Sequence, residues 1–341
     1  LRTVLNLRLY GVSAATKLTH SPPLPRGTDA ICDLLDLMAD LQPDEAIEML
    51  IADVEDAFWQ VPNMPKERRF FVTKVGSDYI VLLRTVQGSR NAGLTWSTLI
   101  ALVARIAQSL FVMPAHRRTR TIEECRLQVY VDDPFAAARG TKARRDLIFA
   151  KLTSLWLVMG LPIAFHKAQR GTQLSWIGIR FTIMDGAIEA DVPSEKLEEV
   201  KAITKKFSAS NIISKKELRT YTGKMQSIGS LLYALRPFVS ILWAALYSPD
   251  GGARACVWTA QVKHALDWFT AFFALSGPGP LSRRFTLTSH LNQGRRMKIV
   301  TDASPYGIGG YIMVDDVIIG YFFDAISQWD CWLLGVSWGH S

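Results

Sequence analysis

The chain has 341 residues, 49% of them hydrophobic and 21% charged, with a formal net charge of +8. This length allows two or three domains with buried cores, and the composition excludes a disordered chain. The excess of Lys and Arg suits a polyanionic partner, although solubility alone is an equally good reason for it.

Neither a metal-thiolate site nor a membrane span is indicated. The four cysteines form no CxxC pair and have no His at ligand spacing. The two longest apolar stretches, 95–113 and 228–248, are interrupted by Arg105 and by Arg236-Pro237, so we interpret them as buried helices. The first residues include no initiator Met and no signal pattern. We therefore expect an intracellular fragment that begins within a longer reading frame.

The predicted elements mix strands and helices. They are, in chain order, a helix over 28–41, a strand over 48–54, two strands within 69–86, a helix from Leu94 to about Phe111, a hairpin whose first strand is 126–131, a helix over 142–159, and strands over 161–168 and 174–183. The pattern then becomes helical and rich in Lys over 193–248, and 298–323 returns to strand, turn and strand. The order predicts an α+β protein.

Three acids stand at the ends of predicted strands. Asp53 ends a buried strand, and Asp132 and Asp133 form the tip of a hairpin. If the fold unites them, their hard oxygens on rigid strands suit two magnesium ions, which is the chemistry of a polymerase. Taken one at a time, each acid is more commonly an ordinary turn or strand-end residue.

Several motifs resemble those of reverse transcriptases. DVEDAF at 53–58 resembles their first catalytic motif, and YVDD at 130–133 resembles their signature hairpin. QGSRNAG at 87–93 is similar to their Gly-containing turn before a template-contacting helix. GLPIAFHKA at 160–168 and LSWIGIRF at 174–181 resemble their Lys-bearing motif and the strand that grips the primer end.

The resemblance implies the reverse transcriptase of a retrotransposon, with a right-hand polymerase fold of fingers, ferredoxin-like palm and helical thumb. Fingers and palm would cover 1–185, and thumb and connection helices 186–280. TDASPYGIGG, within an incomplete ribonuclease H-like start at 296–341, resembles the first strand of that domain and would supply Asp302 as a metal-binding acid. No Glu follows Glu217, so we expect no ribonuclease H activity from this chain.

Carried over by position, the resemblance implies roles for individual residues in copying an RNA or DNA template from dNTPs. Two Mg²⁺ ions, with Mn²⁺ as an alternative, would be held by Asp53, the Val54 carbonyl, Asp132 and Asp133. Lys167 would donate a proton to the leaving pyrophosphate. The dNTP would contact Arg2, Asp56, Ala57, Phe58 and Gln87. The primer and template would contact Gly88, Trp176, Ile177, Gly178, Lys205, Lys206, Lys215 and Lys216.

Other interpretations stay open at this point. Phe58 would exclude a ribose 2′-hydroxyl by its bulk, but it could also be a core aromatic. Lys167 could be a solvated strand residue, and the lysines after 193 a solvated helix face. A degenerate remnant that only binds nucleic acid, an RNA-templated RNA polymerase and a nucleotide cyclase are the alternative functions. The oligomeric state is not indicated.

Overall fold

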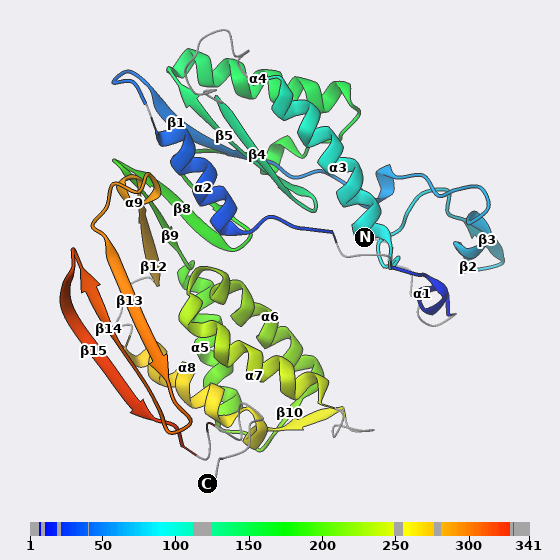
Figure 1. The fold of residues 1–341 in the computed structure, drawn as a ribbon. Helices are drawn as coiled ribbons and strands as arrows, with labels where there is room; N and C mark the ends of the chain where they lie inside the picture. Colours follow the sequence, from blue (N-terminus) through cyan, green and yellow to red (C-terminus); the bar gives the residue numbers. More distant parts are fainter. Residues whose placement is uncertain are drawn as a thin grey trace. The chain divides into compact units, whose positions relative to one another are not determined.

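The computed structural model describes residues 7, 11–18, 22–39, 41–111, 124–248, 255–275, 281–327 and 330 (Figure 1). The chain forms two compact units, Leu1–Leu287 and Thr288–Ser341. The first unit contains two four-stranded sheets and most of the helices. Both of these sheets and all the long helices lie within Leu1–Leu287. The candidate site therefore belongs to the first unit alone.

The first sheet has the strand order β4-β5-β1-β6 and is antiparallel throughout. Its strands are β1 (Ala46–Ile51), β4 (Cys125–Tyr130), β5 (Asp133–Gly140) and β6 (Gln169–Gly171). Helix α2 (Gly27–Met38) covers one face, and α3 (Ala92–Ser109) and α4 (Lys142–Val158) cover the other (Figure 1). The sheet is therefore buried on both sides.

The sequence of β5 explains how one strand serves two cores. Successive side chains of a strand point to opposite faces. Phe135 and Ala137 accordingly pack with α2, while Ala136 and Ala138 pack with α3 and α4. All four are fully buried. The three consecutive alanines allow helices to approach closely from both sides.

The second sheet has the order β12-β9-β8-β7, from β7 (Gln173–Trp176), β8 (Ile179–Met184), β9 (Ala187–Asp191) and β12 (Ser282–Thr286). Strands β8 and β9 are paired, so this sheet crosses the domain boundary predicted at 185/186. Helices follow it, with the short paired strands β10 (Ile212–Ser214) and β11 (Cys256–Trp258). These helices are α5 (Ser194–Ser208), α6 (Lys215–Leu231), α7 (Arg236–Tyr247) and α8 (Lys263–Leu275).

Shorter elements complete the first unit. Strands β2 (Val72–Val75) and β3 (Asp78–Val81) form the predicted hairpin. The remaining short helices are α1 (Val12–Ala15), η1 (Ala57–Gln60), η2 (Arg68–Phe70), η3 (Phe165–Lys167), η4 (Tyr233–Leu235) and η6 (Thr259–Gln261). Within the described residues, no helix is both long and apolar enough to cross a membrane.

The second unit contains an antiparallel sheet of β13 (Met297–Ala303), β14 (Gly307–Val314) and β15 (Val317–Ala325). It is preceded by α9 (Leu287–His290), which begins at the division between the units. Two strands were predicted here, and three are present. Asp315 and Asp316 form the turn between β14 and β15, and both have positive φ.

Two predicted strands of the first unit were wrong. Over 161–168 only Ile163 makes a strand-like bridge, to Val54, and Phe165–Lys167 is a 3-10 turn. The segment 174–183 is a hairpin, because Ile177 and Gly178 both have positive φ and form a two-residue turn between paired Trp176 and Ile179. The turn was not predicted, because its first residue, Ile177, is β-branched and such residues seldom adopt positive φ.

Candidate active site

The hairpin β4–β5 presents the paired acids. Tyr130 pairs with Asp133, so the two-residue tip is Val131 and Asp132, one residue earlier than the predicted tip of Asp132 and Asp133. Val131 has a φ of 55°, an uncommon conformation for a β-branched residue that must be held by its surroundings. Two buried indoles hold it: Trp96 donates to the Val131 carbonyl at 2.6 Å, and Trp176 donates to the Asp133 carbonyl at 3.0 Å.

The end of β1 lies beside this tip. The amide of Val54 donates to the Asp132 carbonyl at 2.9 Å, and the amide of Ala52 donates to the Pro134 carbonyl at 3.1 Å. On its other side the carbonyl of Asp53 accepts from the amide of Ala164 at 2.9 Å. Asp53 and the paired acids, which are 79 residues apart in the chain, are thus joined through backbone hydrogen bonds.

The pKa of Asp133 reflects the two neighbouring carboxylates. Burial and the nearby charges of Asp132 and Asp53 raise the pKa of Asp133 to about 6, against an opposing effect of Lys167. The ammonium group of Lys167 forms an ion pair with the carboxylate of Asp53. The site therefore concentrates negative charge that one lysine only partly offsets.

This donor set has the chemistry of a magnesium site. Carboxylate oxygens are the ligands that Mg²⁺ prefers, and a cation would relieve the crowding that raises the pKa of Asp133. As the described side chains stand, no group of three or more His, Cys, Asp or Glu is gathered closely enough to hold an ion. Lys167 pairs with one carboxylate oxygen of Asp53 in this arrangement, so a metal bound at that oxygen would displace the ammonium group.

A small pocket opens beside the acids. It is lined by Val54, Asp56, Ala57, Phe58, Trp59, Gln87 and Asp132. Four of these are the residues expected to contact the dNTP. Asp56 has a φ of 49° and directs the chain into η1 at the pocket wall, and Phe58 is half-buried against the core beneath α3 and α4. The pocket brings together residues of the DVEDAF, QGSRNAG and YVDD motifs.

The turn between β7 and β8 carries the expected primer-grip residues. Trp176 is buried and reaches the hairpin, whereas Ile177 and Gly178 form the turn itself. Lys196 of α5 donates to the Gly178 carbonyl at 3.3 Å and to the Ser227 hydroxyl of α6 at 2.7 Å. Burial lowers the pKa of Lys196, with the charge of Lys224 acting in the same direction. Hydrogen bonds of Lys196 and Trp176 thus connect α5 and α6, through the β7–β8 turn, to the acid-bearing hairpin.

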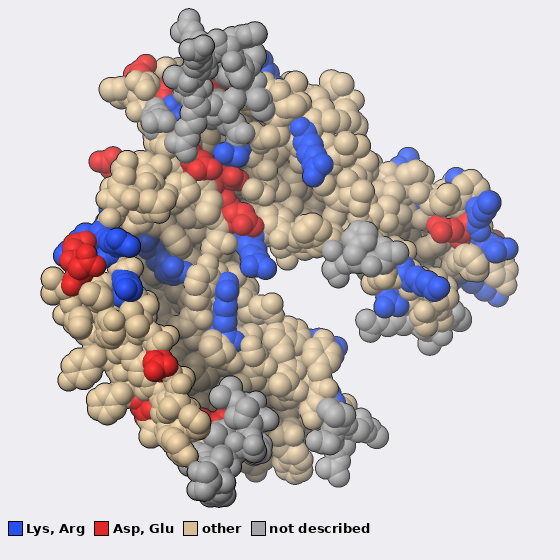
Figure 2. Space-filling model, in the orientation of Figure 1, with Lys and Arg blue, Asp and Glu red and all other residues tan. Residues whose placement is uncertain are grey.

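The other predicted residues lie apart from the acids or make different contacts. Gly88 is exposed with a φ of 105°. Lys205 and Lys216 are exposed, and Lys206 pairs with Glu217 at 2.7 Å. Lys215 begins α6 and its amide donates to the Ala255 carbonyl. Figure 2 shows Lys and Arg in separate small groups, including one over the β2–β3 hairpin.

One predicted residue belongs to the second unit, and another falls outside the described residues. Asp302 lies exposed on β13 of the second unit, where its carboxylate accepts from the amide of Ala303 at 2.9 Å. Arg2 lies outside the described residues.

The resemblance of this chain to known proteins lies in its fold. No protein-family model and no curated protein matches the chain. Among solved structures, it superposes on the foamy viral protease-reverse transcriptase dRH in complex with double-stranded DNA, with 16% identity, a TM-score of 0.54, and coverage of 96% of this chain and 49% of that chain. The fold resembles that of a reverse transcriptase. The foamy viral protease-reverse transcriptase in complex with double-stranded DNA gives 15% identity, a TM-score of 0.52, and coverage of 94% and 58%. This chain spans about half the length of these structures.

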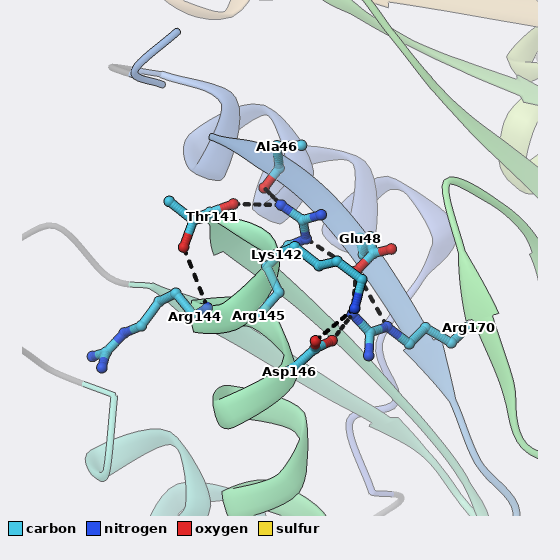
Figure 3. Close-up of polar contacts among 9 residues, drawn as sticks. Ala46, Glu48, Thr141, Lys142, Arg144, Arg145, Asp146 and Arg170 are labelled. Carbon is cyan, nitrogen blue, oxygen red and sulfur yellow. Dashed lines mark hydrogen bonds and ion pairs between the residues drawn. The ribbon is translucent and has the colours of Figure 1, made fainter. Parts of the chain in front are cut away.

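The reverse-transcriptase-like fold contains supporting residues that the sequence motifs did not reveal. Trp96 lies in the helix predicted from Leu94, and no local pattern marks its indole as a donor, because the acceptor carbonyl is 35 residues away. A polar network on the sheet edge is a second case (Figure 3). Glu48 of β1 accepts from Arg145 of α4 and from Arg170 of β6, and Arg170 also pairs with Asp146 at 2.7 Å.

This network fixes β6, and with it the preceding turn that bears Lys167. Burial alone would raise the pKa of Glu48, but the hydrogen bonds from Arg170 and Arg145 together lower it. The guanidinium of Arg170 also lies over the Phe149 ring, 4.8 Å from its centroid. The only sequence signal was an Arg three residues after the motif lysine, which is too common a pattern to single out.

Proposed function

We propose that this chain is an RNA-directed DNA polymerase of a retroelement, which transfers nucleotides from dNTPs to a primer 3′-hydroxyl. The observation that carries the proposal is the pocket where Asp132 of the hairpin meets Asp56, Phe58 and Gln87. These positions come from three separate segments, and each matches a motif of the same enzyme class. An aromatic ring in that pocket favours deoxynucleotides over ribonucleotides.

The chain's own residues would divide the work as follows. When bound, two Mg²⁺ ions would activate the 3′-hydroxyl and neutralise the leaving pyrophosphate. Asp53, Asp132, Asp133 and the Val54 carbonyl would hold them. The backbone at Asp56 and Ala57 would bind the triphosphate, with Arg2 as a further contact, and Gln87 would contact the sugar near its 3′-hydroxyl.

Lys167 would serve as the proton donor to pyrophosphate. Its ion pair with Asp53 places an ammonium group beside the acids, where a polyphosphate would attract it. The turn at Trp176, Ile177 and Gly178 would position the primer end. Gly88 would contact the template, and Lys205, Lys206, Lys215 and Lys216 would neutralise phosphates of the duplex.

The test is extension of a DNA primer on an RNA template with Mg²⁺. Asp132→Asn should lower the rate about a hundredfold or more and leave primer-template affinity nearly unchanged. The matched control is Asp185→Asn, which removes an exposed acid from the turn after β8. Equal rates for the Asp132 variant and the parent would contradict the metal assignment.

The same assay separates the alternative functions. A remnant that only binds nucleic acid would bind the primer-template without extending it. An RNA-templated RNA polymerase would extend with ribonucleotides at least as well as with deoxynucleotides. A nucleotide cyclase would convert a free nucleoside triphosphate in the absence of any template.

A further inference from the structure

Tyr233, in the 3-10 turn between α6 and α7, carries two guanidinium groups on one ring. The guanidinium carbon of Arg236 lies 4.0 Å from the ring centroid and that of Arg283 lies 4.7 Å from it. The tyrosine is 44% exposed, so this cluster is at the surface. Arg283 comes from β12, which follows Tyr233 by about fifty residues, so the fold and not local sequence brings the cations together.

Both guanidiniums are fixed in place by the backbone. Arg236 donates from Nε to the Gly229 carbonyl at 3.0 Å, and Arg283 donates from Nη1 to the Leu231 carbonyl at 2.9 Å. Arg283 is held again by Phe285, whose ring centroid is 4.8 Å from its guanidinium carbon. Each group uses one N–H in this way, and an arginine has five N–H donors. Among the described residues, no other hydrogen bond engages either guanidinium group.

The two charges have no carboxylate partner in the part of the chain that the structure describes. Other arginines of the first unit are paired there: Arg145 with Glu48, and Arg180 with Asp191. Because both guanidiniums lie against one ring, they are within about 9 Å of each other and repel across that distance. An anion that contacts both guanidinium groups would offset this repulsion.

We propose that Arg236, Arg283 and Tyr233 form a binding site for the phosphodiester backbone of a nucleic acid. Guanidinium groups match phosphate oxygens with paired N–H donors, and the ring contacts hold their planes in advance. The nucleic-acid identity of the ligand rests on the proposed function. The site uses none of the residues assigned to the acids, the pocket or the primer grip.

The experiment measures binding of a labelled RNA/DNA duplex without Mg²⁺, so that it does not depend on polymerase activity. Arg236→Gln, Arg283→Gln and the double variant are compared with the parent over a range of salt concentrations. Each lost phosphate contact should reduce the slope of log affinity against log salt by about 0.9. We expect a reduction of one to two such steps in the double variant. Lys142→Gln, which removes an exposed cation paired with Asp146, is the charge-matched control.

A chemical footprint keeps the proposal testable if the variants fold poorly. The parent protein is treated with phenylglyoxal, which modifies arginine, and both positions are followed by mass spectrometry. Duplex should protect Arg236 and Arg283, while inorganic phosphate at the same phosphate concentration should not. Unchanged slopes in folded variants, absence of duplex protection, or equal protection by inorganic phosphate would each overturn the proposal. A protein that binds duplex with the expected slopes but extends no primer would refute only the polymerase function.

Discussion

The indole N–H of Trp176 donates to the backbone carbonyl of Asp133 at 3.0 Å, and this bond ties the second sheet to the acid pair. Trp176 is 2% exposed and its ring lies 5.1 Å from that of Phe135 on the same strand as Asp133. Packing and hydrogen bonding therefore act together on the part of β5 that adjoins the hairpin tip. The donor can be removed without removing the packing.

Trp176→Phe should keep the ring contact with Phe135 and leave the Asp133 carbonyl without its donor. We expect a loss of about 1–3 kcal/mol in the free energy of unfolding, measured with urea, and slower primer extension. The control is Trp243→Phe, because Trp243 donates to Gln226 at 2.6 Å at the surface. A larger loss in the control would contradict this role for Trp176.

Gly178→Ala and Gly186→Ala separate backbone strain from the contact with Lys196. Both glycines have positive φ, 78° and 61°, so alanine at either should cost about 1–2 kcal/mol. Only at Gly178 would the new Cβ meet another group, since it would lie 2.4 Å from Nζ of Lys196. Displacing that ammonium from its two acceptors should add roughly 1 kcal/mol to the loss. Equal losses in urea unfolding would show that Lys196 adjusts freely.

The contribution of Asp33 to the free energy of unfolding should be smaller at neutral pH than at acidic pH. Burial, helped by Asp36 and Asp29, raises its pKa from 3.8 to about 6, against the effects of Gln128 and Arg126. The folded state therefore favours the protonated acid, and this contribution is full below about pH 4 and lost as pH rises through 6. Asp33→Asn should be more stable than the parent at pH 7 by roughly 1–3 kcal/mol. The difference in unfolding free energy should shrink toward pH 4, and a constant difference would contradict the assignment.

Phe58→Ala tests the choice of sugar. If the ring occupies the space of a 2′-hydroxyl, its removal should help GTP more than it harms dGTP. We expect the ratio of kcat/KM for dGTP to that for GTP to fall at least about tenfold, which is roughly 1.4 kcal/mol. Phe70→Ala, at an aromatic that is 51% exposed, is the control. An unchanged ratio would mean that Phe58 is a core aromatic.

The sequence predicted those elements that are formed by local patterns and missed those that depend on residues far apart in the chain. The strand before Asp53 and the hairpin at Asp132 were predictable, since an apolar run and a turn are local patterns. The 161–168 segment was not, because its backbone bonds to Asp53 and Glu55 instead of continuing a strand. Lys196 appeared only as one charge on a Lys-rich helix. Its buried position depends on a turn from another sheet and on Ser227, and no pattern within α5 encodes either.

Helix α2 packs on both sheets, so the first unit has no plane along which it divides cleanly. Its residues share one continuous apolar core with β5, β8, β9 and helices α5 to α8. It begins at Gly27, where a Cβ would lie 2.5 Å from Cδ1 of Ile179. That close approach couples the start of α2 to the strand that follows the Ile177–Gly178 turn. The sheets and helices of this unit should therefore melt in a single cooperative transition, and a cut after residue 185 should destabilise both halves instead of releasing two folded pieces.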